Sequence, residues 1–80
     1  MKLRYKDYET GFLHVWDGSE VTCFGDAGEE RFREAREPIK SVALAYLDKS
    51  GQDGSDIIVL HINGTAPAHA LEVTDFEVSL

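Results

Sequence analysis

The sequence has little cysteine and no long apolar run, and each shortage excludes a class of protein. Its 80 residues contain one cysteine, Cys23, which excludes an intrachain disulfide and a metal site built from several cysteines. No apolar stretch approaches the roughly 18 residues that a membrane-spanning helix needs. Residues 1–7 lack the apolar core of a signal peptide, so we expect a cytoplasmic protein without a membrane partner.

Basic residues are also scarce, and none follows Lys49. Residues 1–40 hold seven basic and nine acidic side chains, whereas residues 41–80 hold one and six, so the net charge is −7. Because binding to nucleic-acid phosphates requires clustered lysine and arginine, we expect no direct nucleic-acid partner. A basic protein partner is allowed. The alternative is that the charge only keeps a small protein soluble.

The longest periodic pattern lies in residues 29–49. At the helical spacing of about 100° per residue, one face is apolar and the opposite face is acidic. We therefore predict one amphipathic helix, kinked at Pro38, although an internal proline costs about 3 kcal/mol. Two helices, with Pro38 at the start of the second, are the alternative. The predicted apolar face comprises Phe32, Ala35, Ile39, Val42, Ala43, Tyr46 and Leu47.

The rest of the chain predicts short strands. The Asp17-Gly18 pair between two of them signals a hairpin. A three-residue loop that pairs Val15 with Val21 gives one wholly apolar face, so we prefer it to a two-residue loop. A change of apolar phase in the last strand predicts a bulge near Thr74. The predicted strands are residues 2–8 at an edge, 12–16, 20–24, 56–62 in the centre with both faces buried, and 70–80.

Together these elements predict a single α+β domain over residues 1–80. An antiparallel sheet of four to five strands would carry the helix on one face, in the order β-β-β-α-β-β. In the preferred hairpin register, Phe12, Trp16 and Phe24 lie on the face away from the Val15–Val21 pair. They are either covered by another part of the chain or form an exposed patch, which on a monomer usually marks a binding surface.

We find no arrangement of residues that predicts catalysis, a metal or a cofactor. His14, His61 and His69 lack metal-site spacing, and the aspartates near residue 50 lack the ligand order of a calcium loop. Cys23 and His14 would point to opposite faces of the hairpin, so Cys23 is expected to be a small core residue. We therefore expect a protein that is not an enzyme and that binds no metal or cofactor.

From Phe12 onward, the sequence resembles a family of small bacterial proteins called domain of unknown function 1488. In members of this family, an aromatic strand is followed by a turn, a second strand, a helix with the pattern Phe-x3-Arg-x2-Ile, and a late strand that ends in Asp-Phe. Pro38 and residues 64–69 depart from this pattern. The resemblance implies the predicted architecture and transfers no activity, because none is established for the family. The matching residues are Phe12, Trp16, Phe24, Phe32, Arg36, Ile39, Tyr46, Asp75 and Phe76.

The leading functional hypothesis is a non-enzymatic acidic binding protein that inhibits or modulates a basic, nucleic-acid-handling protein. Phage anti-CRISPR proteins and nucleic-acid mimics share this size and charge. Trp16 would be the apolar anchor, with Phe12 and Phe24 in support. The alternative is a small bacterial housekeeping or regulatory domain, with a homodimer formed through the aromatic face. The acidic residues predicted to contact the partner are Glu30, Glu34, Glu37, Glu72, Asp75 and Glu77.

Overall fold

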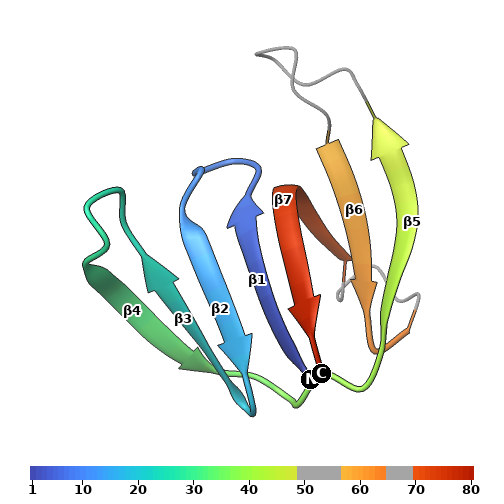
Figure 1. Cartoon of the computed structure of the whole chain (residues 1–80), viewed down its shortest axis with the longest axis horizontal. Coiled ribbons are helices and arrows are strands. Elements are labelled where there is room, and N and C mark those ends of the chain that lie inside the picture. The colour runs from blue at the N-terminus through green and yellow to red at the C-terminus, as the bar shows by residue number, and fades with distance from the viewer. Residues whose placement is uncertain (49–56, 65–69) are drawn as a thin grey trace.

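A computed structural model describes residues 1–48, 57–64 and 70–80, and every regular element in them is a β-strand. The strands form one antiparallel sheet in the order β4-β3-β2-β1-β7-β6-β5 (Figure 1). The predicted α+β class is therefore wrong, and the described part of the chain contains no helix that could cross a membrane. The strands are β1 (Lys2–Asp7), β2 (Leu13–Asp17), β3 (Glu20–Phe24), β4 (Glu30–Ala35), β5 (Val42–Asp48), β6 (Ile57–Ile62) and β7 (Ala70–Ser79).

The segment predicted as a kinked helix is divided between two strands at opposite edges of the sheet. β4 pairs with β3, β5 pairs with β6, and residues 36–41 connect β4 to β5. Pro38 lies in this connection, outside the strands, so its missing N–H removes no hydrogen bond between strands. Of the predicted apolar face, Phe32 is 47% exposed, whereas Ile39 is 6% exposed. Strand pairing thus provides hydrogen bonds for backbone N–H and C=O groups, some of which a helix through Pro38 would have left without a partner.

The first hairpin has a two-residue loop. Trp16 pairs with Val21 and Asp17 with Glu20, so the predicted three-residue loop and its register are wrong. Gly18, the first loop residue, has φ +61°, the conformation that a type II′ turn requires there. β1 is also central, paired with both β2 and β7, instead of the predicted edge strand. This register turns Trp16 toward the core.

β7 joins the two halves of the sheet and bends between them (Figure 1). Lys6 pairs with Asp75 and Asp7 pairs with Val73, so Thr74 is the extra residue of a bulge, which confirms the prediction. β6 lies between β7 and β5, which confirms a central strand. Its burial is uneven, however: Leu60 and Ile62 are buried, while the residues that alternate with them are half-buried, so the prediction of two buried faces is wrong.

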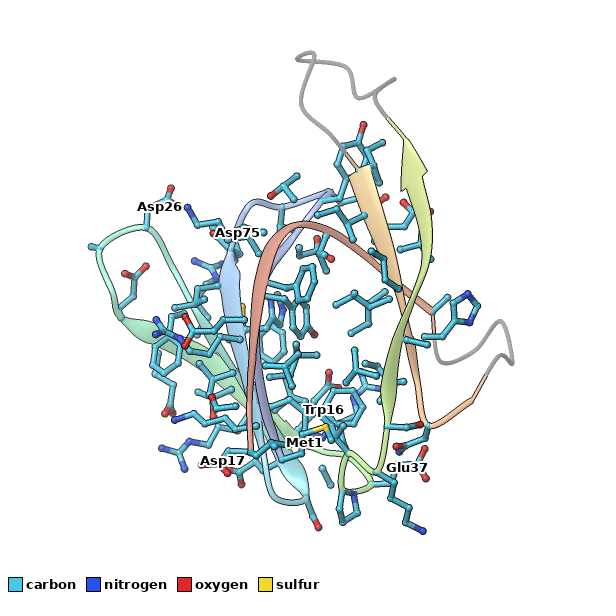
Figure 2. All side chains as sticks on the ribbon, turned by 45° about the vertical axis from the view of Figure 1, so that its right-hand side comes forward. Met1, Trp16, Asp17, Asp26, Glu37 and Asp75 are labelled. Carbon is cyan, nitrogen blue, oxygen red and sulfur yellow. The ribbon has the colours of Figure 1, made fainter. Side chains whose placement is uncertain are left out.

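The core lies on the inner face of the curled sheet, between the β1–β4 half and the β5–β6 half (Figure 2). Residues 36–41 pass beneath it, from β4 at one edge to β5 at the other (Figure 1). Ile39 inserts its side chain into the core from this crossing segment. Asn63 ties the segment down, because its Oδ1 accepts from the Lys40 and Ser41 N–H groups and its Nδ2 donates to the Pro38 carbonyl. The buried core residues are Leu3, Tyr5, Trp16, Val21, Ile39, Leu60, Ile62 and Val73.

Candidate functional site

A groove of about 590 Å³ opens on the inner face beside the β1–β2 turn and the β3–β4 turn. Because aromatic side chains form much of it, we call it the aromatic groove. Its volume lies in the range of small-molecule and side-chain binding sites, roughly 300–1,000 Å³. The residues that line it are Asp7, Thr10, Phe12, His14, Cys23, Glu29, Glu30, Arg31 and Phe32.

Aromatic rings pack against one another at the aromatic groove. The His14 ring lies parallel to that of Tyr5, with 4.9 Å between centroids, and meets the Phe32 ring edge-on at 6.2 Å. The Nδ1 of His14 lies 3.2 Å from the Phe12 carbonyl oxygen. Arg31 already places its guanidinium 4.7 Å from the centre of the Phe12 ring, a cation–π contact. The aromatic groove therefore contains one planar cation of the chain itself, held against an aromatic ring.

Three carboxylates surround these rings. Asp7 accepts hydrogen bonds from the Thr10 N–H and hydroxyl at 2.9 and 3.1 Å, which fixes the turn after β1. Glu29 accepts from the Ala27 N–H at 3.1 Å, and Glu30 accepts from the Arg33 Nε at 2.7 Å. Because an ionised carboxylate offers about four lone-pair sites, each keeps capacity for a further donor.

A second groove of about 410 Å³, the acidic groove, shares one lining residue, Asp7, with the first. The Tyr8 N–H donates to the Glu72 carbonyl at 2.9 Å, which holds the β1–β2 turn against β7. Five carboxylates thus border the two grooves, and Arg31 is the only lysine or arginine among the described residues that line them. The acidic groove is lined by Asp7, Glu9, Val59, Ala70, Leu71 and Glu72.

Cys23 does not offer a reactive thiol to the aromatic groove. It pairs directly with His14 across the hairpin, so the prediction that the two point to opposite faces is wrong. Burial nevertheless raises the pKa of the Cys23 thiol, with only 1% of the residue exposed, and a thiol that stays protonated is a poor nucleophile. The expected core position of Cys23 is confirmed.

The histidines and acidic residues form no metal site in the described part of the chain. No group of three or more His, Cys, Asp or Glu residues there could hold an ion. His61 has a buried Nδ1 without a hydrogen-bond partner and lies in β6, whereas His69 lies outside the described residues. The described residues that line the two grooves are mainly acidic and aromatic or apolar.

The three aromatic residues predicted to form one surface are separated. Trp16 is 7% exposed in the core, so it cannot serve as an exposed anchor. Phe12 lines the aromatic groove, whereas Phe24 pairs with Leu13 and lines a hollow on the outer face. The register explains this outcome, because Phe12 and Trp16 share the inner face while Phe24 alternates to the outer one.

The predicted acidic residues are divided as well. Glu30 lines the aromatic groove and Glu72 the acidic groove. Asp75 and Glu77 lie elsewhere on β7, opposite Lys6 and Arg4. The other two lie along or beyond edge strand β4: Glu34 accepts from Arg36 at 2.7 Å, and the carbonyl of Glu37 accepts from Trp16.

Sequence reasoning missed Asp7, Glu9, His14, Glu29 and Phe32 as residues of the grooves. The helical pattern predicts a buried position for Phe32, whereas the alternation of Phe32 with Arg31 and Arg33 is the signal that indicates a strand. A two-residue loop at Gly18 would have placed His14 beside Cys23 on the inner face. Asp7 and Glu9 had no local signal beyond their place in a turn.

Comparison with known protein families, curated proteins and solved structures gives no match. The resemblance to the domain of unknown function 1488 family therefore stays a prediction. The helix that it implies around Phe32 and Ile39 is replaced by β4 and the crossing segment.

Proposed function

We propose that this chain is a non-enzymatic binding protein that takes a basic segment of a protein partner into the aromatic and acidic grooves. The observation that supports the proposal is the set of five carboxylates bordering two grooves that share Asp7, one of them lined by the partly exposed Phe32 ring. A lysine or arginine side chain of the partner would meet carboxylates on the rim and an aromatic face on the floor. Both contacts favour the same ligand charge.

The charge of the whole chain supports the same partner. A net charge of −7 on 80 residues attracts a basic surface and speeds encounter, with a range set by a screening length of about 8 Å at physiological ionic strength. The Arg31–Phe12 contact shows that the aromatic groove accommodates a guanidinium. A partner arginine would stack on Phe32 or take the place of Arg31.

The apolar anchor in this proposal is Phe32, with Phe12 in support. Phe32 is 47% exposed at the edge of the groove, whereas Trp16 is buried. Charge alone gives fast association and little residence time, so the ring contact would account for slow dissociation. Loss of the ring should therefore change the dissociation rate more than the association rate.

Nucleic-acid-handling proteins are the partner class that we propose, because they present basic surfaces to their substrates. A protein that occupies such a surface would act as an inhibitor or modulator, in the manner of a nucleic-acid mimic or an anti-CRISPR protein. We place this activity in the cytoplasm, where a reducing environment keeps the free Cys23 thiol reduced.

The test uses two double variants that change the net charge equally, from −7 to −5. Glu9→Gln/Glu72→Gln removes two carboxylates from the acidic groove, and Asp75→Asn/Glu77→Gln removes two on β7 outside both grooves. The probe is a synthetic arginine-rich peptide, and binding kinetics are measured at low and physiological salt. We expect the first pair to weaken binding about tenfold more than the second, mainly through association.

Phe32→Ala should speed dissociation of the same peptide. Nuclear magnetic resonance shifts on titration with the peptide should cluster around Asp7, Glu30 and Phe32. Equal affinities for the two charge variants, or shifts centred on Asp75 and Glu77, would overturn the assignment of the site. Absence of binding at low salt would overturn the proposed function.

A further inference from the structure

The two edges of the sheet differ in their protection against pairing with another strand. β4 carries four charges among its six residues, Glu30, Arg31, Arg33 and Glu34, and all its side chains are exposed. β5 has no charged residue before Asp48, and Leu44 on it is 60% exposed. An edge strand presents unpaired N–H and C=O groups, and charged side chains are a common means of preventing their pairing.

Self-pairing of β4 is opposed by its own sequence. A two-fold axis perpendicular to the sheet pairs the strand with its copy about one central residue. Centred on Phe32, this pairing sets Arg31 opposite Arg33 and Glu30 opposite Glu34. Centred on Arg33, it sets that arginine opposite its own copy. Like charges directly opposite each other are destabilising, so pairing of β4 with β4 of a second copy is disfavoured. We call β4 the guarded edge.

Self-pairing of β5 meets no such conflict. Centred on Ala43, it sets Val42 of one copy opposite Leu44 of the other, and no charged pair arises between residues 41 and 45. Val42 and Leu44 both lie on the inner face, opposite Ile62 and Leu60. Leu44 is 60% exposed on β5, beyond which no strand of the described residues lies, and Val42 of a second copy would cover it. The bulge between Leu44 and Tyr46 restricts this pairing to the first part of β5.

We propose that two copies of this chain pair antiparallel through the start of β5, centred on Ala43, so that two seven-stranded sheets become continuous. The unpaired backbone, the uncharged self-complementary register and the exposed Leu44 all fit a second copy of β5. The proposal does not rest on the binding of a basic partner, because none of the residues that line the aromatic or the acidic groove belongs to β5.

Sedimentation equilibrium over a range of concentrations tests the proposal. We expect the wild-type chain to reach twice its monomer mass of 8.9 kDa. Leu44→Lys should remain monomeric, because it sets a lysine of each copy among the paired residues. Phe32→Lys, the matched change of an exposed apolar residue on the guarded edge, should dimerise like the wild type. Circular dichroism verifies that both variants fold.

Variants with one added cysteine test the register directly, because the native Cys23 is buried and shielded from oxidation. Ala43→Cys should form an intermolecular disulfide, since only the central residue faces its own copy. Val42→Cys and Leu44→Cys should each form none alone and cross-link when mixed, because each is about 7 Å along the strand from its own copy. A wild type that stays monomeric, a dimeric Leu44→Lys, or cross-linking at residue 42 or 44 alone would overturn the proposal.

Discussion

The indole Nε1 of Trp16 donates a hydrogen bond to the main-chain carbonyl of Glu37, 3.0 Å away. This bond joins β2 in one half of the sheet to the segment that crosses toward β5 in the other (Figure 2). Trp16 is also 7% exposed and contributes to the core. The Trp16 side chain therefore fills part of the core and also holds the crossing segment in place.

Trp16→Phe should separate the hydrogen bond from most of the packing. The phenyl ring keeps an apolar body in the core but leaves the Glu37 carbonyl without its donor, so the free energy of unfolding should fall by about 1–3 kcal/mol. Glu37→Gln keeps the main-chain carbonyl and should change it by less than about 0.5 kcal/mol. Urea denaturation followed by circular dichroism measures both. Equal losses in the two variants would show that the indole bond contributes nothing particular.

Ile39 and Phe32 provide a test of the strand assignment itself. A helix over residues 29–49 would bury both, whereas the structure leaves Phe32 47% exposed and buries Ile39 to 6% exposure. Ile39→Ala should therefore lower the free energy of unfolding by about 2–5 kcal/mol. Phe32→Ala should lower it by less than about 1 kcal/mol. Comparable losses measured by thermal unfolding would contradict the placement of Ile39 in the crossing segment.

The elements that sequence predicts correctly are those with a local signal. Residues 57–62 are rich in β-branched side chains, and the shift of apolar phase around Thr74 directly indicated a bulge. Residues 29–49 carried an ambiguous signal instead. Two strands of six and seven residues, joined by an apolar Ile39, reproduce the spacing of a helix closely enough that periodicity cannot distinguish them. Pro38 was the stronger evidence and indicated a connection.

The hairpin register and the grooves depend on distant parts of the chain. The predicted apolar face is wrong because Leu13 and Val15 occupy the outer face. They are half-buried there beside the long side chains of Lys2, Arg4 and Lys6. The acidic groove exists only because the sheet brings Glu9 beside Glu72, more than sixty residues later. No local pattern encodes that approach, so only the acidic character of the site could be predicted.

Asn63 links β6 to the crossing segment and adopts φ +59° while doing so. Asn63→Ala removes three hydrogen bonds and places an alanine in the left-handed region, so unfolding should become easier by about 2–4 kcal/mol. Asn63→Gly removes the same bonds without the conformational penalty and should cost about 1 kcal/mol less. Urea denaturation of both variants tests this order. A glycine variant as unstable as the alanine variant would show that the backbone conformation carries no cost.

Tyr5 should make stability fall in alkaline solution. Burial raises the pKa of Tyr5 from 10.0 to about 12, with Asp7 and Glu34 adding to the rise and Arg36 opposing it. The folded chain therefore holds the phenol proton to higher pH than the unfolded chain does. This contribution to stability is complete below about pH 10 and is lost as the pH rises through about 12.

Tyr5→Phe keeps the ring that stacks on His14 and removes the titrating group, so its urea midpoint should decline less steeply between pH 10 and 12. Burial also raises the pKa of Cys23, from 9.0, and a Cys23→Ala variant separates this contribution, which begins at lower pH. Stability profiles measured by circular dichroism in urea at several pH values supply the comparison. If wild type and Tyr5→Phe decline in parallel above pH 10, the buried phenol is not the group responsible.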